Sequence, residues 1–264
     1  MTGIERITNV FAADKTIKVM THVVGGYPSL EVCEALIGTM AENGVDLIEV
    51  QLPFSDPTAD GPVIVQANHH ALQNGITTDM VLAMLAKIRR QVDIPLLIMS
   101  YINPLYAFGI SEIVARAVAI GVDGFIVPDC PLDEPELGLP GLCAKNKCAF
   151  VPLIAPTTTP ERMKDIVAKS ISPFVYAVLR MGVTGRKTAL DQATIDYLHL
   201  IKETTGRYVA AGFGIREKAQ LEALTGYADC GIVGSALLQK VNEALDTKKN
   251  PVNALGVFLD NLMG

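Results

Sequence analysis

The sequence alternates eight short β-rich runs with stretches of helical periodicity, and this alternation constrains the fold most. Strands that alternate with helices along a chain pair in parallel, one βα unit after another. Eight such units favour closure into a barrel over an open sheet, so we predict a TIM (β/α)8 barrel in one domain, residues 1–264. The expected strands are residues 17–24, 46–52, 95–100, 124–128, 149–154, 174–179, 208–212 and 231–234.

The sequence predicts helices beyond the one that each βα unit requires. Residues 4–14 predict an extra N-terminal helix that closes the bottom of the barrel, and residues 63–74 and 78–91 predict two helices between the second and third strands. An aspartate recurs where a helix joins a strand, at Asp46, Asp123 and Asp229. These joins belong to the bottom of a barrel, where residues serve stability, so we expect a structural role for the three aspartates.

Composition narrows the environment and the partners. Hydrophobic residues make up 50% of the 264 residues, which suits parallel strands buried on both faces. The net charge of −6 argues against nucleic acid or an acidic membrane as a partner. We expect a cytoplasmic protein with reduced thiols, because the sequence shows no membrane span, no signal peptide and no paired cysteine spacing. No His/Asp cluster is spaced for a metal, so no metal site is predicted.

The most informative stretch runs from residue 47 to residue 62, where a strand leads into a turn-rich loop. Strand alternation places Leu47, Glu49 and Gln51 on one face, so a carboxylate lies within an apolar strand. Burying an ionised carboxylate is costly, which makes Glu49 a candidate catalytic group together with Asp60 of the loop. The alternatives are a solvent-facing Glu49 at the strand end and an Asp60 that only serves turn chemistry.

Glycine-rich loops follow the seventh and eighth strands and predict a phosphate site. Gly214 and Gly234 would let backbone N–H groups approach an anion, and Ser235 begins a helix whose dipole favours negative charge. The loops after these two strands are the usual phosphate position in this fold. The alternative is that the glycines only make tight turns.

Residues 47–62 also resemble the signature of the tryptophan synthase alpha chain family, in which a strand-end Glu precedes Pro-Phe-Ser-Asp-Pro and Ala-Asp-Gly-Pro. Similar motifs continue around the predicted barrel rim, so the resemblance covers essentially the whole chain. They lie at residues 25–29, 100–104, 124–129, 155–158, 180–185, 212–215 and 233–236.

The resemblance implies a lyase that cleaves indole-3-glycerol phosphate by a retro-aldol reaction into indole and glyceraldehyde 3-phosphate. Glu49 would transfer protons if burial raises its pKa, and Asp60, on a loop open to water, would stay ionised and accept the ring N–H. The implied apolar slot for the ring comprises Tyr101, Ile126, Ile154, Tyr176 and Phe213, with Thr184 beside it. The implied phosphate contacts are Gly185, Gly214, Gly234 and Ser235, with residues 182–185 as a lid.

The family also implies the partners. The chain itself would carry no cofactor, and it would pair with a pyridoxal-phosphate beta chain in an alpha-beta-beta-alpha complex that channels indole. Asp56, Pro57 and Asn103-Pro104 match loops that the family turns toward this partner.

Two residues depart from the family pattern. Gln51 stands where a Gly is usual and could fill the pocket or hold Glu49 away, and an inward-facing His22 could pair with Glu49 and lower its pKa. These departures keep open a weakly active or inactive subunit that activates a beta partner. A stand-alone indole-releasing lyase is a further alternative. Another phosphate-binding barrel, such as a phosphoribosyl isomerase, is the last, and residues 47–62 argue against it.

Overall fold

The computed structural model describes the chain except residues 131, 134–136, 180–189 and 213. Its strands form one parallel sheet with the order β5-β4-β3-β2-β1-β9-β8-β7-β6. This confirms the predicted barrel class. The strands are β1 (Lys18–Val24), β2 (Leu47–Gln51), β3 (Leu96–Met99), β4 (Gly124–Ile126), β5 (Ala149–Val151), β6 (Leu153–Ile154), β7 (Phe174–Val178), β8 (Tyr208–Gly212) and β9 (Cys230–Val233).

The predicted fifth strand, residues 149–154, is divided in two by Pro152. Proline has no N–H to give to a ladder, which interrupts regular pairing at that residue. The first half pairs with β4 and the second half pairs with β7. The two ends of the sheet are therefore neighbours in the chain, and the sheet closes into a barrel through this one segment.

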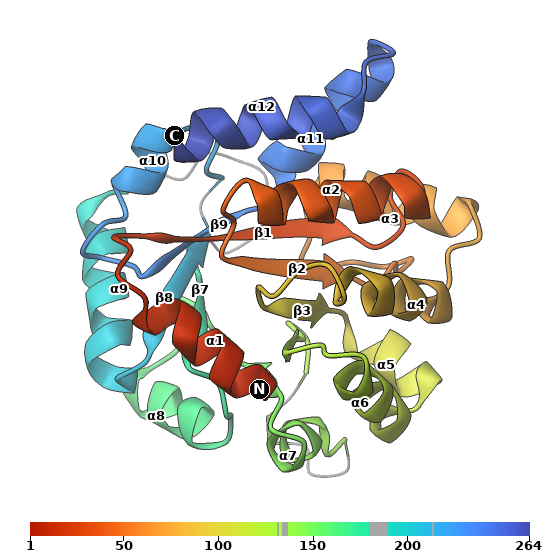
Figure 1. The fold of residues 1–264 in the computed structure, drawn as a ribbon. Coiled ribbons are helices and arrows are strands. Elements are labelled where there is room, and N and C mark those ends of the chain that lie inside the picture. The colour runs from red at the N-terminus through yellow and green to blue at the C-terminus, as the bar shows by residue number, and fades with distance from the viewer. Residues whose placement is uncertain (131, 134–136, 180–189, 213) are drawn as a thin grey trace.

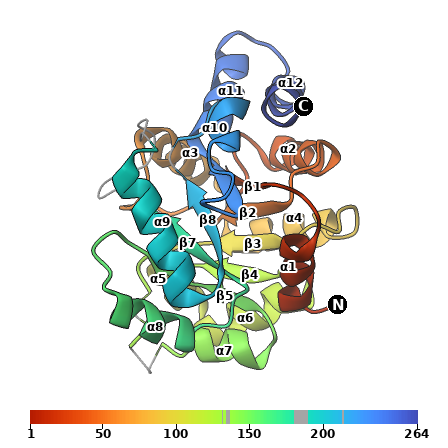
Figure 2. The ribbon, with the colours of Figure 1, turned by 90° about the vertical axis from the view of Figure 1, so that its left-hand side faces the viewer.

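Helices surround the strands on the outside (Figures 1 and 2). Both predicted helices between β2 and β3 are present, as α3 and α4. The helices are α1 (Gly3–Ala12), α2 (Leu30–Glu42), α3 (Pro62–Gln73), α4 (Thr78–Ile88), α5 (Ile102–Phe108), α6 (Ile110–Ala119), α7 (Leu139–Lys145), α8 (Pro160–Ala168), α9 (Gln192–Thr205), α10 (Lys218–Glu222), α11 (Ser235–Asp246) and α12 (Pro251–Met263). In the described part of the chain, no helix is both long and apolar enough to cross a membrane.

Strand alternation divides the apolar residues into an outer and an inner cluster. The outer cluster fills the space between strands and helices, with residues such as Val23, Ile48 and Val50. The inner cluster fills the barrel because alternate residues of each strand point inward. Its strand residues are Met20, Leu47, Leu97, Met99, Ile126, Ala149, Val151, Phe174, Ala210, Cys230 and Ile232.

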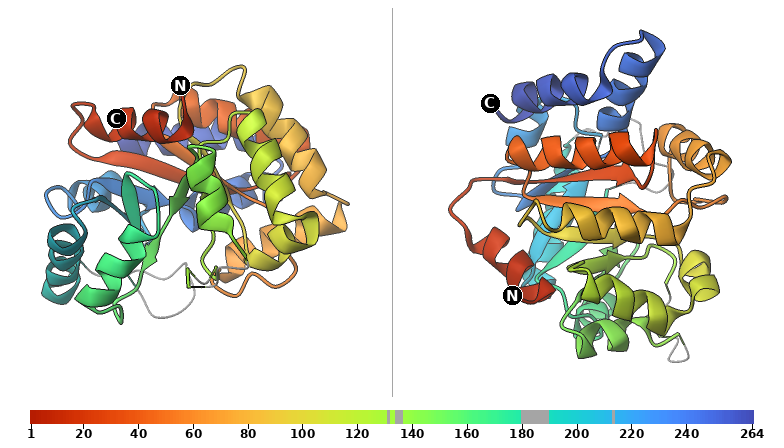
Figure 3. Two further views of the ribbon diagram at one scale, coloured as in Figure 1. Left: turned by 90° about the horizontal axis from the view of Figure 1, so that it is seen from below. Right: turned by 45° about the vertical axis from the view of Figure 1, so that its right-hand side comes forward.

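The extra N-terminal helix α1 closes the end of the barrel at which the strands begin (Figure 3). Its buried residues Ile7 and Phe11 join the inner cluster. The Phe11 ring lies 5.2 Å from that of Phe174 and 4.9 Å from that of Tyr208, the first residues of β7 and β8. The predicted position of this helix is confirmed.

The three recurring aspartates each connect two neighbouring strands at this end. The carboxylates of Asp46, Asp123 and Asp229 each accept a backbone N–H of an adjacent strand, from Val19, Leu96 and Val209 respectively, at 2.8 Å. Each aspartate also pairs with a cation: Lys15 with Asp46, Arg6 and Arg89 with Asp123, and Lys202 with Asp229. The structural role expected for these residues is therefore confirmed.

Asp123 is the most buried of the three, so Asp123→Ala tests the contribution of this repeat to stability. The substitution leaves Arg6 and Arg89 without their carboxylate, and we expect the free energy of unfolding to fall by about 3 kcal/mol. Asp46→Ala, at the more exposed equivalent position, is the matched control with an expected loss of about 1 kcal/mol. Urea denaturation measures both, and equal losses would contradict the dependence on burial.

Candidate active site

Two polar side chains meet inside the barrel where β1 and β2 end. The parallel register sets His22 opposite Glu49, and both residues point into the barrel interior. His22 Nδ1 lies 2.6 Å from Glu49 Oε1. His22 is 3% exposed and Glu49 is 4% exposed, so this is a buried ion-pair geometry. The solvent-facing alternative for Glu49 is wrong, and the inward pairing of His22 is confirmed.

The second carboxylate, Asp60, is held by donors from two strands. Gln51 Nε2 donates to Asp60 Oδ2 at 2.8 Å, and the Tyr101 hydroxyl donates to the same oxygen at 3.0 Å. The Tyr101 oxygen also accepts the Ala59 N–H at 2.9 Å, which fixes the loop that carries Asp60. Asp60 is therefore part of a polar network at the barrel mouth.

The expectation that Asp60 stands open to water is wrong, because only 7% of the residue is exposed. Its loop folds back over the strand ends and the side chain bonds inward to Gln51 and Tyr101. Burial raises the pKa of Asp60, while the charge of His22 and the two donors act in the opposite direction. Gln51 thus donates its hydrogen bond to Asp60 and not to Glu49.

The electrostatics of the mouth couple four residues. Burial by itself lowers the pKa of His22, but the hydrogen bond and charge of Glu49, with the charge of Asp60, outweigh burial and raise it. Burial and the charges of Glu49 and Asp60 raise the pKa of Tyr176, which keeps its hydroxyl neutral. Tyr176 on β7 therefore lies within the field of both carboxylates.

Three buried polar atoms in this cluster have no partner at normal hydrogen-bond distance among the described residues, although the Gln51 side chain lies near enough to His22 to help raise its pKa. They are His22 Nε2, Glu49 Oε2 and Gln51 Oε1. Unsatisfied buried polar atoms are costly, and they concentrate where a ligand supplies the missing partner. The barrel mouth is thus suited to receive a polar ligand between β1, β2 and β7.

The structure brings most of the predicted ring slot together. Tyr101, Ile126 and Tyr176 all belong to the inner cluster or pack against it. Ile154 does not: it pairs with Ala177 and lies in the outer cluster, whereas its neighbour Leu153 faces inward opposite Tyr176. Side chains alternate along a strand, so the inward position of Val151 predicts that Leu153, two residues later, also faces the barrel interior. Phe213 and Thr184 lie outside the described residues.

Phe54 is a lining residue that the sequence reasoning did not select. It packs against the inner cluster, with its ring 5.5 Å from that of Tyr101. Its backbone N–H donates to Asn68 Oδ1 on α3 at 3.0 Å, which fixes the start of the loop. Its position in the Pro-Phe-Ser motif, shortly after β2, could have identified Phe54 as a lining residue.

The described part of the predicted phosphate site lies beside this cluster. Gly214 adopts a φ of +80°, which favours glycine, and Gly234 immediately precedes Ser235, the first residue of the 12-residue helix α11. A Cβ on Gly234 would lie 3.3 Å from that of His22, so the helix start and the carboxylates share one end of the barrel. Gly185 lies outside the described residues.

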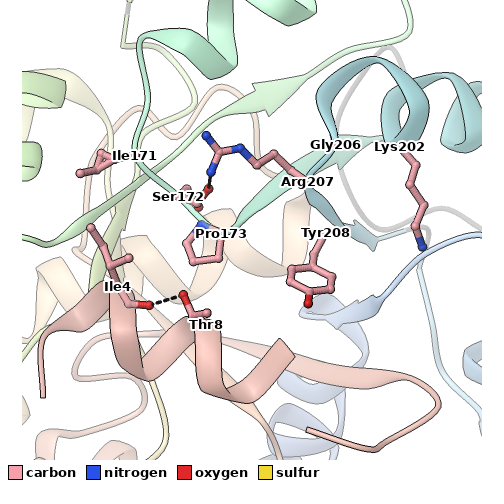
Figure 4. Close-up of a pocket in the computed structure, with 9 residues that line it drawn as sticks. All are labelled: Ile4, Thr8, Ile171, Ser172, Pro173, Lys202, Gly206, Arg207 and Tyr208. Atoms are coloured by element: carbon pink, nitrogen blue, oxygen red, sulfur yellow. Dashed lines mark hydrogen bonds between the residues drawn. The ribbon is translucent and has the colours of Figure 1, made fainter. Parts of the chain in front are cut away.

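An open pocket of about 670 Å³ lies at the opposite end of the barrel, between α1 and the start of β8 (Figure 4). Its two cations are engaged: Arg207 donates to the carbonyl of Ser172 and Lys202 pairs with Asp229. In the described residues, no group of three or more His, Cys, Asp or Glu is placed to hold a metal. Glu49 and Asp60 lie at the other end of the barrel.

A parallel βα barrel with two buried carboxylates at the carboxyl ends of its strands has the architecture of the barrel enzymes, whose active sites lie at that end. A model of the tryptophan synthase alpha chain family matches residues 10–263. The chain therefore belongs to the tryptophan synthase alpha chain family, and the resemblance seen in the sequence is confirmed.

Known proteins support this membership over the full length. The tryptophan synthase alpha chain of Desulfotalea psychrophila is 39% identical over 261 residues, which cover 98% of this chain and 99% of that protein. The crystal structure of tryptophan synthase subunit alpha from Legionella pneumophila matches with a TM-score of 0.89 and 29% identity, covering 99% and 97% of the two chains. The tryptophan synthase A-subunit of Pyrococcus furiosus matches with a TM-score of 0.84 and 28% identity, covering 94% and 98%.

The donors around Asp60 make a prediction about its ionisation. Gln51→Met and Tyr101→Phe each remove one donor that favours the carboxylate, so each should raise the pKa of Asp60 further. Carbon-13 NMR of the carboxyl group during a pH titration measures the shift. Thr21→Val, a buried change on β1 facing the outer layer, is the control and should leave Asp60 unchanged. An unshifted Asp60 in both variants would refute the network.

Proposed function

We propose that the protein cleaves indole-3-glycerol phosphate into indole and glyceraldehyde 3-phosphate, as the carbon–carbon lyase and alpha subunit of a tryptophan synthase. Membership of the family supports the reaction. The observation that carries the assignment to these residues is the buried Glu49, whose Oε2 lacks a partner among the described residues, beside the buried Asp60.

Glu49 is the proton-transferring group in this proposal. The protonated carboxyl gives its proton to the indole ring carbon that bears the glycerol chain. The resulting carboxylate then takes the proton of the glycerol hydroxyl, while the carbon–carbon bond breaks and an aldehyde forms. One proton leaves Glu49 and one returns, so the residue ends each cycle as it began.

Asp60 supports the charge that develops on the indole nitrogen. When the ring carbon is protonated, the ring N–H becomes positive, and a carboxylate that accepts this N–H stabilises the intermediate. Gln51 and Tyr101 hold the carboxyl group in place by its Oδ2 atom, so its orientation does not depend on the substrate. Tyr101, Ile126, Leu153 and Tyr176 then form the apolar walls for the ring.

The phosphate anchors the other end of the substrate. Gly214, Gly234 and Ser235 supply backbone N–H groups and the positive end of α11, in a region that adjoins His22. Thr184 and Gly185 complete the site as part of a lid in this proposal. Anchoring at the phosphate would set the scissile bond against Glu49.

The proposal extends to the assembly. Residues 1–264 act as one barrel domain that needs no cofactor of its own. A beta chain carrying pyridoxal phosphate receives the indole in an alpha-beta-beta-alpha complex in the cytoplasm. The family name, alpha chain, supports the existence of such a partner.

A second candidate function rests on the engagement of both carboxylates. His22 bonds to Glu49 and Gln51 bonds to Asp60, so neither carboxylate is wholly free. If these contacts persist with substrate bound, the chain serves chiefly to activate its beta partner. Activity with and without the beta chain separates the two candidates.

The test of the main proposal is indole release from indole-3-glycerol phosphate by the purified chain, alone and with a beta chain. We expect slow release alone and faster release in the complex. Glu49→Gln keeps the shape but removes the acid, and should lower kcat by about 1,000-fold. Stimulation of the beta reaction without any indole release would support the activator instead, and absence of both would refute the family function.

If the substrate phosphate binds at the start of α11, a negative charge introduced there should weaken substrate binding more than one introduced further along the helix. Ser235→Glu places a negative charge at the helix N-terminus and should raise KM for indole-3-glycerol phosphate by about tenfold, because it repels the phosphate. Gln239→Glu adds the same charge one turn later on the same helix and is the matched control. Similar KM values for the two variants would contradict this position of the phosphate.

A further inference from the structure

The contact between His22 and Glu49 extends the proposed mechanism, on which the following inference rests. We propose that His22 is a positioning residue for Glu49: it holds Oε1, leaves Oε2 as the oxygen that meets the substrate, and stores with Glu49 the proton that the reaction uses. His22 itself does not touch the reacting atoms.

The fold fixes the imidazole at its place. β1, the strand that carries His22, pairs with β2 through residue 24 and with β9 through residue 21, so His22 follows directly on a segment that is paired on both sides. His22 stands directly opposite Glu49 in the register, and the end of β9 at Gly234 lies against its side chain. With 3% exposure, the ring has little freedom to leave the carboxylate.

The hydrogen bond divides the two oxygens of Glu49 by role. Oε1 is engaged by His22 Nδ1 at 2.6 Å, whereas Oε2 is buried without a partner among the described residues. A carboxyl group held through one oxygen presents the other in a fixed direction. The free oxygen is therefore the one placed to give a proton to the ring carbon and to take one from the glycerol hydroxyl.

Among the described residues, the charged groups that act on His22 favour a proton on the pair. Glu49 on β2 and Asp60 on the following loop are both acidic and both raise the pKa of His22 against the effect of burial. Tyr176 on β7, which lies near both carboxylates, is kept neutral by burial, which raises its pKa. The cation of β1, Lys18, donates to the carbonyls of Ala13 and Lys15 at the other end.

The His22–Glu49 pair gives one proton to the substrate and takes one proton back in each reaction cycle. In the reactive form His22 is a neutral imidazole whose Nδ1–H donates to Oε1, and the proton of the pair is on Oε2. Oε2 gives this proton to the ring carbon, and the Nδ1–H of His22 stabilises the carboxylate that the transfer leaves. Oε2 then takes one proton from the hydroxyl as the carbon–carbon bond breaks. The active form is therefore the pair with this one proton, and two coupled groups lose it at a pH that belongs to the pair.

The pH profile of kcat tests the proposal, with two variants of His22. His22→Phe removes both the hydrogen bond and the proton store; we expect kcat to fall about tenfold and the alkaline limb to move about one unit lower. His22→Asn keeps a donor near the Nδ1 position; it should restore kcat to within about threefold but not the alkaline limb. KM should change little in either, because the phosphate holds the substrate.

The titration of His22 gives a second readout that does not depend on turnover. Nitrogen-15 NMR of the imidazole should show a lower midpoint in Glu49→Gln than in the wild type, because the variant loses the hydrogen bond and charge that oppose the effect of burial. Circular dichroism and thermal unfolding verify that each variant is folded.

These experiments distinguish failure of the role proposed for His22 from failure of the proposed lyase function. A wild-type pH profile in folded His22→Phe, or a His22 midpoint unchanged by Glu49→Gln, overturns the proposal. If the wild type releases no indole at all while the midpoint moves as expected, the lyase function fails and the coupling of the pair stands as a property of the site. A lower kcat in both variants with no movement of the alkaline limb overturns the proton store.

Discussion

A closed parallel sheet forces alternate residues of every strand into one enclosed space, and the rest of this structure depends on that constraint. Near the start of the strands, the inward residues are apolar and α1 covers them with Ile7 and Phe11. Near the end of the strands, the same alternation turns His22, Glu49 and Gln51 inward. A shift of one residue in the register would exchange these polar groups with Val23, Ile48 and Val50.

Each buried carboxylate at the mouth of the barrel has a polar partner that offsets the cost of its burial. An isolated buried carboxylate is strongly disfavoured, and each of the two carboxylates here has a nitrogen donor or partner from a neighbouring position. His22 serves Glu49, and Gln51 serves Asp60 together with Tyr101. These partners stabilise the site in the absence of a ligand while leaving Glu49 Oε2 unpaired among the described residues. The site is thus preorganised and at the same time incomplete.

The two ends of the barrel use aspartates in opposite ways. At the start of the strands, Asp46, Asp123 and Asp229 are saturated by backbone N–H groups and by cations, which fixes the sheet. At the other end, Asp60 is held by uncharged donors, and burial raises its pKa as it does that of Asp123. A saturated carboxylate has little capacity left for chemistry, whereas Asp60 is held without a cation bonded to it in the described network.

The sequence by itself determined the barrel, the extra helix, the paired helices after β2 and the structural aspartates, because these follow from local periodicity and capping. It also determined which face carried Glu49, and it identified the family. The division of residues 149–154 at Pro152 and the inward position of Leu153 were readable from proline chemistry and alternation, although Ile154 was chosen instead.

Only the tertiary structure decided which polar groups meet. The sequence raised a contact between His22 and Glu49 as one possibility, but the bonds from Gln51 and Tyr101 to Asp60 join residues 9 and 41 positions apart, and no local pattern encodes them. The burial of Asp60 was decided by the same means, since a loop residue is exposed or covered according to how the loop folds over the strand ends. Long-range packing sets the environment of a carboxylate, and that environment sets its ionisation.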